Sequence, residues 1–282
     1  MTMQRSGLNT SHNDQHARES GFSAIEMLIT LALLTIVLGV VVKGIIELQA
    51  RNFNENGKVD AVQESRDFID QMTRDIHGTG YPPPAVMYQT NPRCTNGLGA
   101  VYAAVRNNAN IACGIVAFST TGVTYEADLD GLGTVSVVYL QLVPPTGTTN
   151  CPCQLQRGTV TKTAWIANNS ITPSYFTTVN GVLNSGDGTG VNAGVLTGSG
   201  APIYPLVMNG PGSYASYANA DAFNAYDANG SLITTSCSLT TNPDCSQIRN
   251  LQITANVAPP YYDVVTKVFP VYSITSKARI NF

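Results

Sequence analysis

The sequence is poor in charge and in histidine, and both shortages restrict the possible functions. Charged residues make up 12% of the 282 residues, and the formal net charge is -3. A nucleic-acid-binding protein needs a basic surface to neutralise phosphates, so this balance argues against a nucleic-acid partner. Of the three histidines, only His77 lies beyond residue 20. A catalytic triad or a multi-histidine zinc site would have one candidate histidine there, so we expect no enzyme activity, catalytic residue or cofactor.

Proline is missing between Phe22 and Tyr81, and charge is almost missing from the first part of that stretch. Residues 22–42 contain a single charged side chain, that of Glu26. As a helix, these 21 residues would extend about 32 Å, enough to cross the hydrocarbon core of a bilayer. The sequence therefore predicts a transmembrane helix over 22–42, preceded by a polar leader over 1–21.

No cleavage motif of the A-x-A type follows the apolar run, which argues against an ordinary secretory signal peptide. A processing motif lies before the run instead, as Gly21-Phe22-Ser23-Ala24-Ile25-Glu26. This segment resembles the class III signal of type IV prepilins, G-F-[ST]-x-x-E followed by an apolar helix. The resemblance implies that a membrane aspartyl prepilin peptidase cuts between Gly21 and Phe22 and methylates the new Phe22 amine. The helix then stays on the mature protein as a membrane anchor and later as part of a fibre core.

Glu26 is the unusual residue of this helix. An ionised carboxylate in hydrocarbon costs a few kcal/mol on insertion scales unless another group pairs with it. Cleavage would leave a free amine on Phe22, one helical turn away. In a stack of parallel helices, Glu26 of one subunit could then neutralise the Phe22 amine of the next. The alternative is an ordinary single-pass anchor whose Glu26 reaches the membrane interface.

The helix is expected to continue over 43–80, since no proline interrupts it and apolar residues recur near every 3.6 positions. This apolar stripe contains Ile45, Leu48, Val59, Val62, Ile69, Met72 and Ile76. Charges on the same stretch alternate in sign at four-residue steps, a spacing that stabilises an exposed helix. They form two runs, Lys43, Glu47, Arg51 and Glu55, then Arg66, Asp70 and Arg74. The runs suit either a contact between subunits or a solvated helix face.

The end of the helix is marked by glycines at 78 and 80 and by prolines 82–84. Residues 74–81, Arg-Asp-Ile-His-Gly-Thr-Gly-Tyr, resemble the R-D-[IL]-x-x-A-G-Y segment of PilW-like minor pilins and of the larger pseudopilins of type II secretion. Thr79 departs from the alanine of that pattern. The resemblance implies a pilin fold, in which the far half of a long helix packs against an antiparallel sheet.

Beyond residue 80 the pattern changes from helical to strand-like, so residues 81–282 are expected to form a β-rich globular domain with long loops. Apolar or alternating stretches predict strands at 114–120, 123–127, 134–142, 158–167, 251–257 and 264–281. Residues 179–229 are rich in Gly, Asn, Ala, Ser and Tyr with little periodicity, which predicts a low-complexity loop. Pattern and resemblance both indicate an α+β fold, a long N-terminal helix packed on an antiparallel β-sheet.

Two carboxylates lie in the turn Asp128-Leu129-Asp130-Gly131-Leu132-Gly133. Closely spaced acidic residues on a glycine-rich turn can bind calcium, but the third acidic position and the distal Glu of an EF-hand are missing. Asp and Gly also occur in hairpin turns for backbone reasons alone. The hairpin turn is the preferred interpretation, with Asp128 and Asp130 as a weak calcium candidate and no other metal site.

All six cysteines follow the apolar run, which fits disulfides formed in an oxidising compartment. They are Cys94, Cys113, Cys151, Cys153, Cys237 and Cys245. Their positions along the chain suggest that Cys237 and Cys245 close one polar loop and that Cys94 and Cys113 close another. Cys151 and Cys153 flank a proline and either form a tight ring or pair elsewhere. A C-x-C redox motif is the alternative for this middle pair.

The expected function is structural: a minor pilin or pseudopilin for assembly, initiation or the tip of a type IV pilus or a related secretion or competence fibre. The resemblance implies as partners the prepilin peptidase, other major and minor pilins and the inner-membrane assembly platform. It also implies a single pass of the inner membrane with the globular domain in the periplasm, followed by incorporation into a pilus or pseudopilus. The alternative is a pilin-anchored adhesin or binding module at the cell surface, which could use the tyrosines of residues 179–229.

Overall fold

The computed structural model describes residues 23–83, 106–145, 151–168, 171–184, 217, 220–238, 245–259 and 270–280. Its contacts divide the chain into two compact units, Met1–Gln49 and Ala50–Phe282. One long helix, α1 (Ala24–His77), contributes to both units. The other elements belong to the second unit. They are β1 (Ile115–Ser119), β2 (Gly122–Asp128), β3 (Val135–Val143), β4 (Cys153–Thr161), α3 (Lys162–Ala167), β5 (Ser174–Val182), β6 (Phe223–Tyr226), β7 (Leu232–Ile233), β8 (Cys237–Ser238), η3 (Cys245–Gln247), β9 (Asn250–Val257) and β10 (Tyr272–Arg279).

The first unit contains the start of α1, whose side chains are exposed. The helix begins after Ser23, whose carbonyl oxygen accepts the backbone N–H groups of Glu26 and Met27 at 2.9 and 3.1 Å. Among the described residues, α1 is the one helix long and apolar enough to cross a membrane. Its side chains offer water a continuous apolar surface, for example Leu28 and Val40, which are each 69% exposed. The start of α1 is therefore a candidate single-pass membrane anchor, as the sequence predicts.

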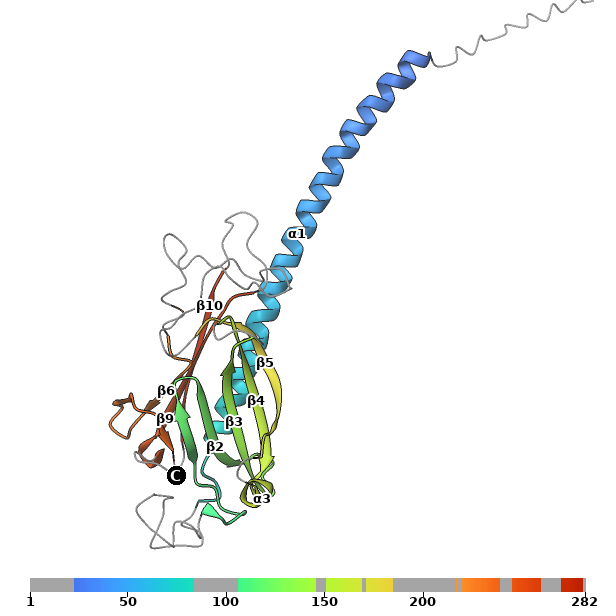
Figure 1. The fold of residues 1–282 in the computed structure, drawn as a ribbon. Coiled ribbons are helices and arrows are strands. Elements are labelled where there is room, and N and C mark those ends of the chain that lie inside the picture. Colours follow the sequence, from blue (N-terminus) through green and yellow to red (C-terminus); the bar gives the residue numbers. More distant parts are fainter. Residues whose placement is uncertain are drawn as a thin grey trace, which may run out of the picture. The chain divides into compact units, whose positions relative to one another are not determined.

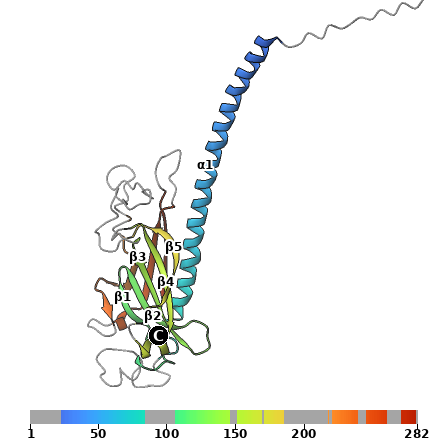
Figure 2. The ribbon, with the colours of Figure 1, turned by 45° about the vertical axis from the view of Figure 1, so that its right-hand side comes forward.

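The second unit is built on an antiparallel sheet of ten strands (Figure 1). The strand order is β7-β6-β9-β5-β4-β3-β2-β1-β8, and β10 pairs with β9. Strands β1 to β5 follow one another across the sheet in chain order (Figure 2). By contrast, β5 and β9 share a single residue pair, Val182 and Val257. The sheet is open, and together with α1 it confirms the predicted α+β fold class.

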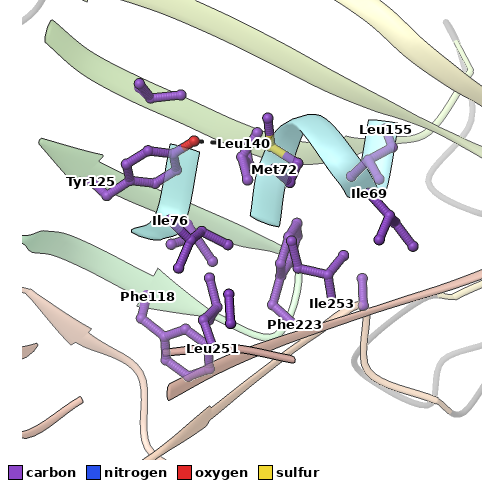
Figure 3. Packing of buried hydrophobic residues seen from close by; sticks show 14 of the residues in the cluster. Ile69, Met72, Ile76, Phe118, Tyr125, Leu140, Leu155, Phe223, Leu251 and Ile253 are labelled. Carbon is purple, nitrogen blue, oxygen red and sulfur yellow. Dashed lines mark hydrogen bonds between the residues drawn. The ribbon is translucent and has the colours of Figure 1, made fainter. Parts of the chain in front are cut away.

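The far half of α1 buries one stripe of side chains against this sheet (Figure 3). The buried residues are Ala61, Ser65, Phe68, Ile69, Met72 and Ile76. They recur at three- and four-residue steps, so they share one face of the helix. Their apolar members form one cluster with residues from several strands, among them Leu140, Leu155, Phe223 and Ile253. The helix is thus part of the core of the second unit.

Polar contacts join α1 to strands on both sides of the β5–β9 contact. Asn180 of β5 donates from Nδ2 to Glu64 Oε1 at 3.2 Å. On the other side, Thr73 Oγ1 lies 3.0 Å from Ser276 Oγ of β10. Because β5 and β9 pair at a single position, these contacts and the shared apolar cluster connect the two parts of the sheet through the helix.

The opposite face of the sheet carries a second, smaller apolar cluster. Along β3, Val138 and Leu140 belong to the cluster on the α1 side, whereas Val137 packs with Trp165 of α3. Alternation of side chains along a strand produces this division. Both faces of β3 are therefore buried, which accounts for its almost continuous run of apolar residues.

The strand predicted over 158–167 is wrong in its second half. Strand β4 ends at Thr161, and helix α3 follows directly. Thr161 caps this helix, because its Oγ1 accepts the backbone N–H of Ala164 at 3.3 Å. The short helix buries Lys162 and Trp165. An alternation pattern could not detect this change, since six helical residues are too few to show a helical period.

The loop predicted over 179–229 is also wrong at both ends. Strand β5 runs through Val182, and strand β6 lies inside the predicted loop. Their pairing partners are β4 for β5, and β9 with β7 for β6. Only Val179–Val182 of β5 lies inside the predicted loop, and β6 has four residues, so both stretches are too short to show a clear alternation. Residues 185–216, 218 and 219 of the predicted loop lie outside the described residues, as do residues 264–269 and 281 of the strand predicted over 264–281.

The side chain of Asn184 joins the places where the chain leaves and re-enters the sheet. Its Nδ2 donates to the carbonyl oxygens of Ala220 and Asp221 at 3.2 and 3.4 Å. Its Oδ1 accepts the backbone N–H of Asn256 in β9 at 2.8 Å. The side chain is buried. Residues 184 and 220 are therefore held near each other beside β9.

Candidate functional site

Of the residues predicted for cleavage and fibre assembly, the structure describes Glu26, whereas Gly21 and Phe22 lie outside the described residues. Glu26 lies in the first turn of α1, where the helix dipole favours a negative charge. It is exposed, and its neighbours Ile25 and Met27 are exposed as well. No other charged residue occurs between Ala24 and Val42. The described half of the predicted site is therefore a single carboxylate on an otherwise apolar helix surface.

The predicted calcium candidate is a hairpin turn between β2 and β3. Asp128 accepts the backbone N–H of Gly131 at Oδ1 and that of Gly133 at Oδ2, at 2.9 and 2.8 Å. Asp130 Oδ1 accepts the N–H of Leu132 at 2.9 Å. Gly131 and Gly133 have φ angles of 73° and 84°, which glycine adopts without strain. These contacts support the interpretation preferred from the sequence, that the acidic residues stabilise the backbone of a hairpin turn.

The pKa of Asp128 gives this turn a testable pH dependence. Partial burial acts to raise the pKa, but hydrogen bonds from Gly133, Asp130 and Gly131 outweigh it and hold the pKa below its ordinary value. Because the pKa is lower in the folded protein, ionised Asp128 stabilises the fold at pH values above its unfolded-state pKa of about 4. This stabilisation is lost as the pH falls through the folded-state pKa. We expect Asp128→Asn to lower the free energy of unfolding at pH 7 by less than about 1 kcal/mol, because the turn is solvated.

Urea denaturation at pH 7 and at pH 3 measures this effect. The difference in the free energy of unfolding between wild type and Asp128→Asn should be smaller at the lower pH. Added calcium should change the free energy of unfolding of neither protein. Stabilisation of the wild type alone by calcium would restore the metal site as the explanation.

The described cysteines are all in disulfides. Cys237 of β8 pairs with Cys245 of η3, which matches the pairing suggested from the sequence. Cys151 pairs with Cys153, the tight ring that was one of the two possibilities for these residues. Cys113 is also disulfide-bonded, and Cys94 lies outside the described residues. These five disulfide-bonded cysteines fit folding in an oxidising compartment.

A buried ion pair is the polar feature that sequence reasoning missed. Lys162 Nζ, at the start of α3, lies 2.7 Å from Glu126 Oε2 of β2, and both side chains are 0% exposed. Glu126 Oε2 also accepts the backbone N–H of Cys113 at 2.7 Å, and Lys162 donates to the carbonyl oxygen of Ile111 at 2.6 Å. Burial raises the pKa of Glu126 and lowers that of Lys162, while their attraction opposes both shifts.

This ion pair has a structural rather than a catalytic arrangement. Its hydrogen bonds connect β2, α3 and the segment that precedes β1. Arg106 of that segment lies over the Trp165 ring, with Cζ 5.0 Å from the ring centroid. Glu126 Oε1 and Arg106 Nε are buried without a hydrogen-bond partner. The cluster fixes the segment and α3 to the outer face of the sheet.

A second ion pair fixes the end of α1 to the sheet. Arg157 of β4 donates from Nε and Nη2 to Asp75 Oδ2 at 3.1 and 2.8 Å. The hydroxyl of Tyr125 in β2 donates to the same oxygen at 3.3 Å. Asp75 belongs to the segment that resembles PilW-like minor pilins. In this chain the aspartate therefore orients the end of the helix on two strands.

A groove of about 600 Å³ lies beside α1 in the second unit. Its lining consists of Glu55, Lys58, Val59, Val62, Gln63, Arg66, Asp67 and Asp70 of α1 and Tyr272 of β10. The α1 residues recur at three- and four-residue steps, so they form one helix face. Two valines and the tyrosine supply apolar surface, and charges of both signs surround it. We call this feature the α1 groove.

Comparisons of the chain with protein-family models, with curated proteins and with solved structures find no match.

Proposed function

We propose that this chain is a structural subunit of a type IV pilus or a related secretion or competence fibre, as a minor pilin or pseudopilin. One observation carries the proposal. The single helix α1 begins as an exposed apolar segment with one carboxylate, Glu26. Its far half buries a stripe of side chains against an antiparallel sheet. A subunit that is first a membrane protein and then a fibre component needs both properties, because its helix must replace lipid contacts with helix contacts while its domain stays folded.

Glu26 has a specific chemical task in this proposal. A lone carboxylate is costly in hydrocarbon, so it favours any arrangement that supplies a cation. Cleavage after Gly21 creates such a cation, the amine of Phe22, at the same depth on a neighbouring helix. Pairing of the two groups makes insertion of a processed subunit favourable and leaves an unprocessed subunit with an unpaired charge. The partners in this proposal are those that the resemblance implies, the prepilin peptidase, other pilins and an inner-membrane assembly platform.

The second unit fits a fibre component rather than an enzyme. Its buried charged groups bond to one another and to backbone atoms that hold elements together. The adhesin alternative depended on a long loop over 179–229, part of which is strand. No described contact favours that alternative, so the structural subunit is the function that we propose.

Two substitutions test the proposed function in cells that assemble the fibre. Gly21→Ala should prevent cleavage, so that the protein keeps residues 1–21 in an intact-mass measurement. Glu26→Ala should be cleaved normally but should lower the number of fibres by about tenfold or more, because the Phe22 amine loses its partner. Thr30→Ala, an exposed polar position on α1 outside the motif, is the matched control and should affect neither result. Normal cleavage and normal fibre number in both Gly21→Ala and Glu26→Ala would contradict the proposal.

A further inference from the structure

The face of the sheet opposite α1 carries an uncharged polar surface on β3, β4 and β5, which lie side by side (Figure 2). We call this surface the amide face, and its residues are Tyr139, Gln141, Gln154, Gln156, Tyr175 and Thr177. We infer that the amide face binds an uncharged, extended polysaccharide. This binding goes beyond the proposed function and does not depend on it. None of these residues belongs to the loop over 179–229 on which the adhesin alternative depended.

The packing of β3 fixes the direction in which the amide face points. Val138 and Leu140 belong to the apolar cluster that includes α1. Because side chains alternate along a strand, Tyr139 and Gln141 point to the opposite side of the sheet. On that side, α3 covers the end of β3 at which Val137 is buried. The amide face lies beyond α3, and its side chains are exposed or partly exposed.

One row of the amide face is aromatic. Tyr139 of β3 pairs with Gly158 of β4, which pairs with Tyr175 of β5. The two tyrosine rings meet edge to face, with centroids 6.5 Å apart and an interplanar angle of 77°. A Cβ at Gly158 would lie 2.9 Å from Tyr175 Cδ1 and 2.8 Å from Pro173 Cγ, so glycine is required there. The row therefore holds two aromatic rings in fixed positions across three strands.

The second row of the amide face consists of amides, two positions along the strands and therefore about 7 Å away. Gln141 donates from Nε2 to Gln156 Oε1 at 3.5 Å, and Gln156 donates from Nε2 to Gln154 Oε1 at 3.2 Å. Thr177 Oγ1 donates to the same Gln154 oxygen at 3.1 Å. A carboxamide has two N–H donors, so each glutamine keeps at least one donor for a ligand. The row thus offers hydrogen-bonding groups whose orientation is already fixed.

The absence of charge restricts the ligand that this surface can bind. Strands β3 and β5 contain no charged residue, and the one charge of β4, Arg157, bonds to Asp75 on the α1 side. Glu126 of β2 is fully buried and paired with Lys162. A surface without cations cannot neutralise the phosphates of a nucleic acid or the headgroups of an anionic membrane. An uncharged ligand is its electrostatic complement, because a charged ligand would lose hydration without gaining a counter-ion.

Sugar rings fit both rows of the amide face. A sugar hydroxyl both donates and accepts hydrogen bonds, as an amide does. The C–H face of a sugar ring is apolar enough to lie against the edge or face of a tyrosine ring. A protein partner would instead need an apolar centre that excludes water, and most of the amide face is polar. An extended chain of sugars can follow the rows across three strands, whereas a coiled chain cannot.

Calorimetric titration of the full-length protein tests the inference, in a detergent without a sugar headgroup. The probes are cellohexaose, xylohexaose and mannohexaose, which are uncharged, extended, β-linked chains. The controls are maltohexaose, an α-linked chain that coils, and hexagalacturonate, which is charged. At least one probe should bind at least about tenfold more tightly than either control. Failure of every probe to bind, or a control that binds as tightly, would overturn the inference.

Substitutions then locate the bound chain. Gln141→Ala with Gln156→Ala removes most of the amide row and should weaken binding by at least about tenfold. The matched control, Gln63→Ala with Gln71→Ala, removes two exposed glutamines of α1 and should change the affinity by less than about twofold. Tyr175→Phe keeps the ring and should stay within about threefold of wild type, whereas Tyr175→Ala should lose about tenfold or more.

Urea denaturation of each variant establishes that it is folded. An unchanged affinity in Gln141→Ala with Gln156→Ala, or an equal loss in its matched control, would reject the amide face as the binding site. These measurements use purified protein and do not involve fibres. Their failure would therefore leave the proposed function standing, and a failure of fibre assembly would leave this inference standing.

Discussion

Replacement of Lys162 by methionine is expected to lower the free energy of unfolding by about 3–5 kcal/mol. The substitution leaves Glu126 fully buried next to a side chain that can no longer donate hydrogen bonds. It also removes the bond to the Ile111 carbonyl oxygen, so the segment before β1 loses one of its attachments. The cost comes mainly from the isolated carboxylate rather than from the lost attraction of the pair.

A double-mutant cycle separates these two contributions. Glu126→Gln with Lys162→Met removes both charges and should cost clearly less than Lys162→Met alone, because no charge stays buried without a partner. Urea denaturation of the full chain in detergent, followed by tryptophan fluorescence, measures Lys162→Met, Glu126→Gln and the double variant. Trp165 is the one tryptophan in the sequence, and it lies in α3 next to the substituted residue. Equal destabilisation by the single and double variants would contradict this account.

Substitution of Met72 by alanine is expected to destabilise the second unit by about 2–5 kcal/mol. Met72 is 0% exposed, and its sulfur lies 3.9 Å from the hydroxyl of Tyr125. It belongs to the cluster that contains residues of α1, β3, β4, β6 and β9 (Figure 3). Truncation at this position would therefore leave a cavity where α1 meets several strands, and a dense core closes such a cavity only in part.

Two control variants define the origin of this loss. Met72→Leu conserves most of the volume and should cost less than about 1.5 kcal/mol. Gln71→Ala changes the adjacent exposed residue and should stay within about 0.5 kcal/mol of wild type. The same denaturation experiment measures all three. Alanine favours the helix at both positions, so a loss in Gln71→Ala as large as that in Met72→Ala would contradict core packing as the origin of the effect.

The sequence was most informative where one periodic pattern extends over many residues. The apolar stripe correctly included Ile69, Met72 and Ile76, which are buried. It also included Ile45 and Leu48, which are exposed. Periodicity alone could not separate these groups, since it shows which residues share a helix face and not what covers that face. Absence of charge before Lys43 was the additional signal that marked the membrane segment.

The buried polar cluster could not be predicted in the same way. Glu126 and Lys162 are 36 positions apart, and no motif in the sequence connects them. Charged residues are rarely fully buried, so a carboxylate beside a glycine-rich turn is read as part of that turn. Only the pairing of β2 with β3, and of β3 with β4, brings the start of α3 near the carboxylate. Information of this kind depends on strand order, which a single sequence does not specify.

The bonds made by Asn184 have a consequence for how this protein can vary. They hold positions 184 and 220 at one place on the sheet, so the chain between them starts and finishes at neighbouring points. The entropy of closing such an interval grows only with the logarithm of its length, by about 0.6 kcal/mol for each doubling. An insertion between these two positions is therefore expected to cost the sheet little. In the proposed fibre subunit, this interval could change in length while the contacts between α1 and the sheet stay the same.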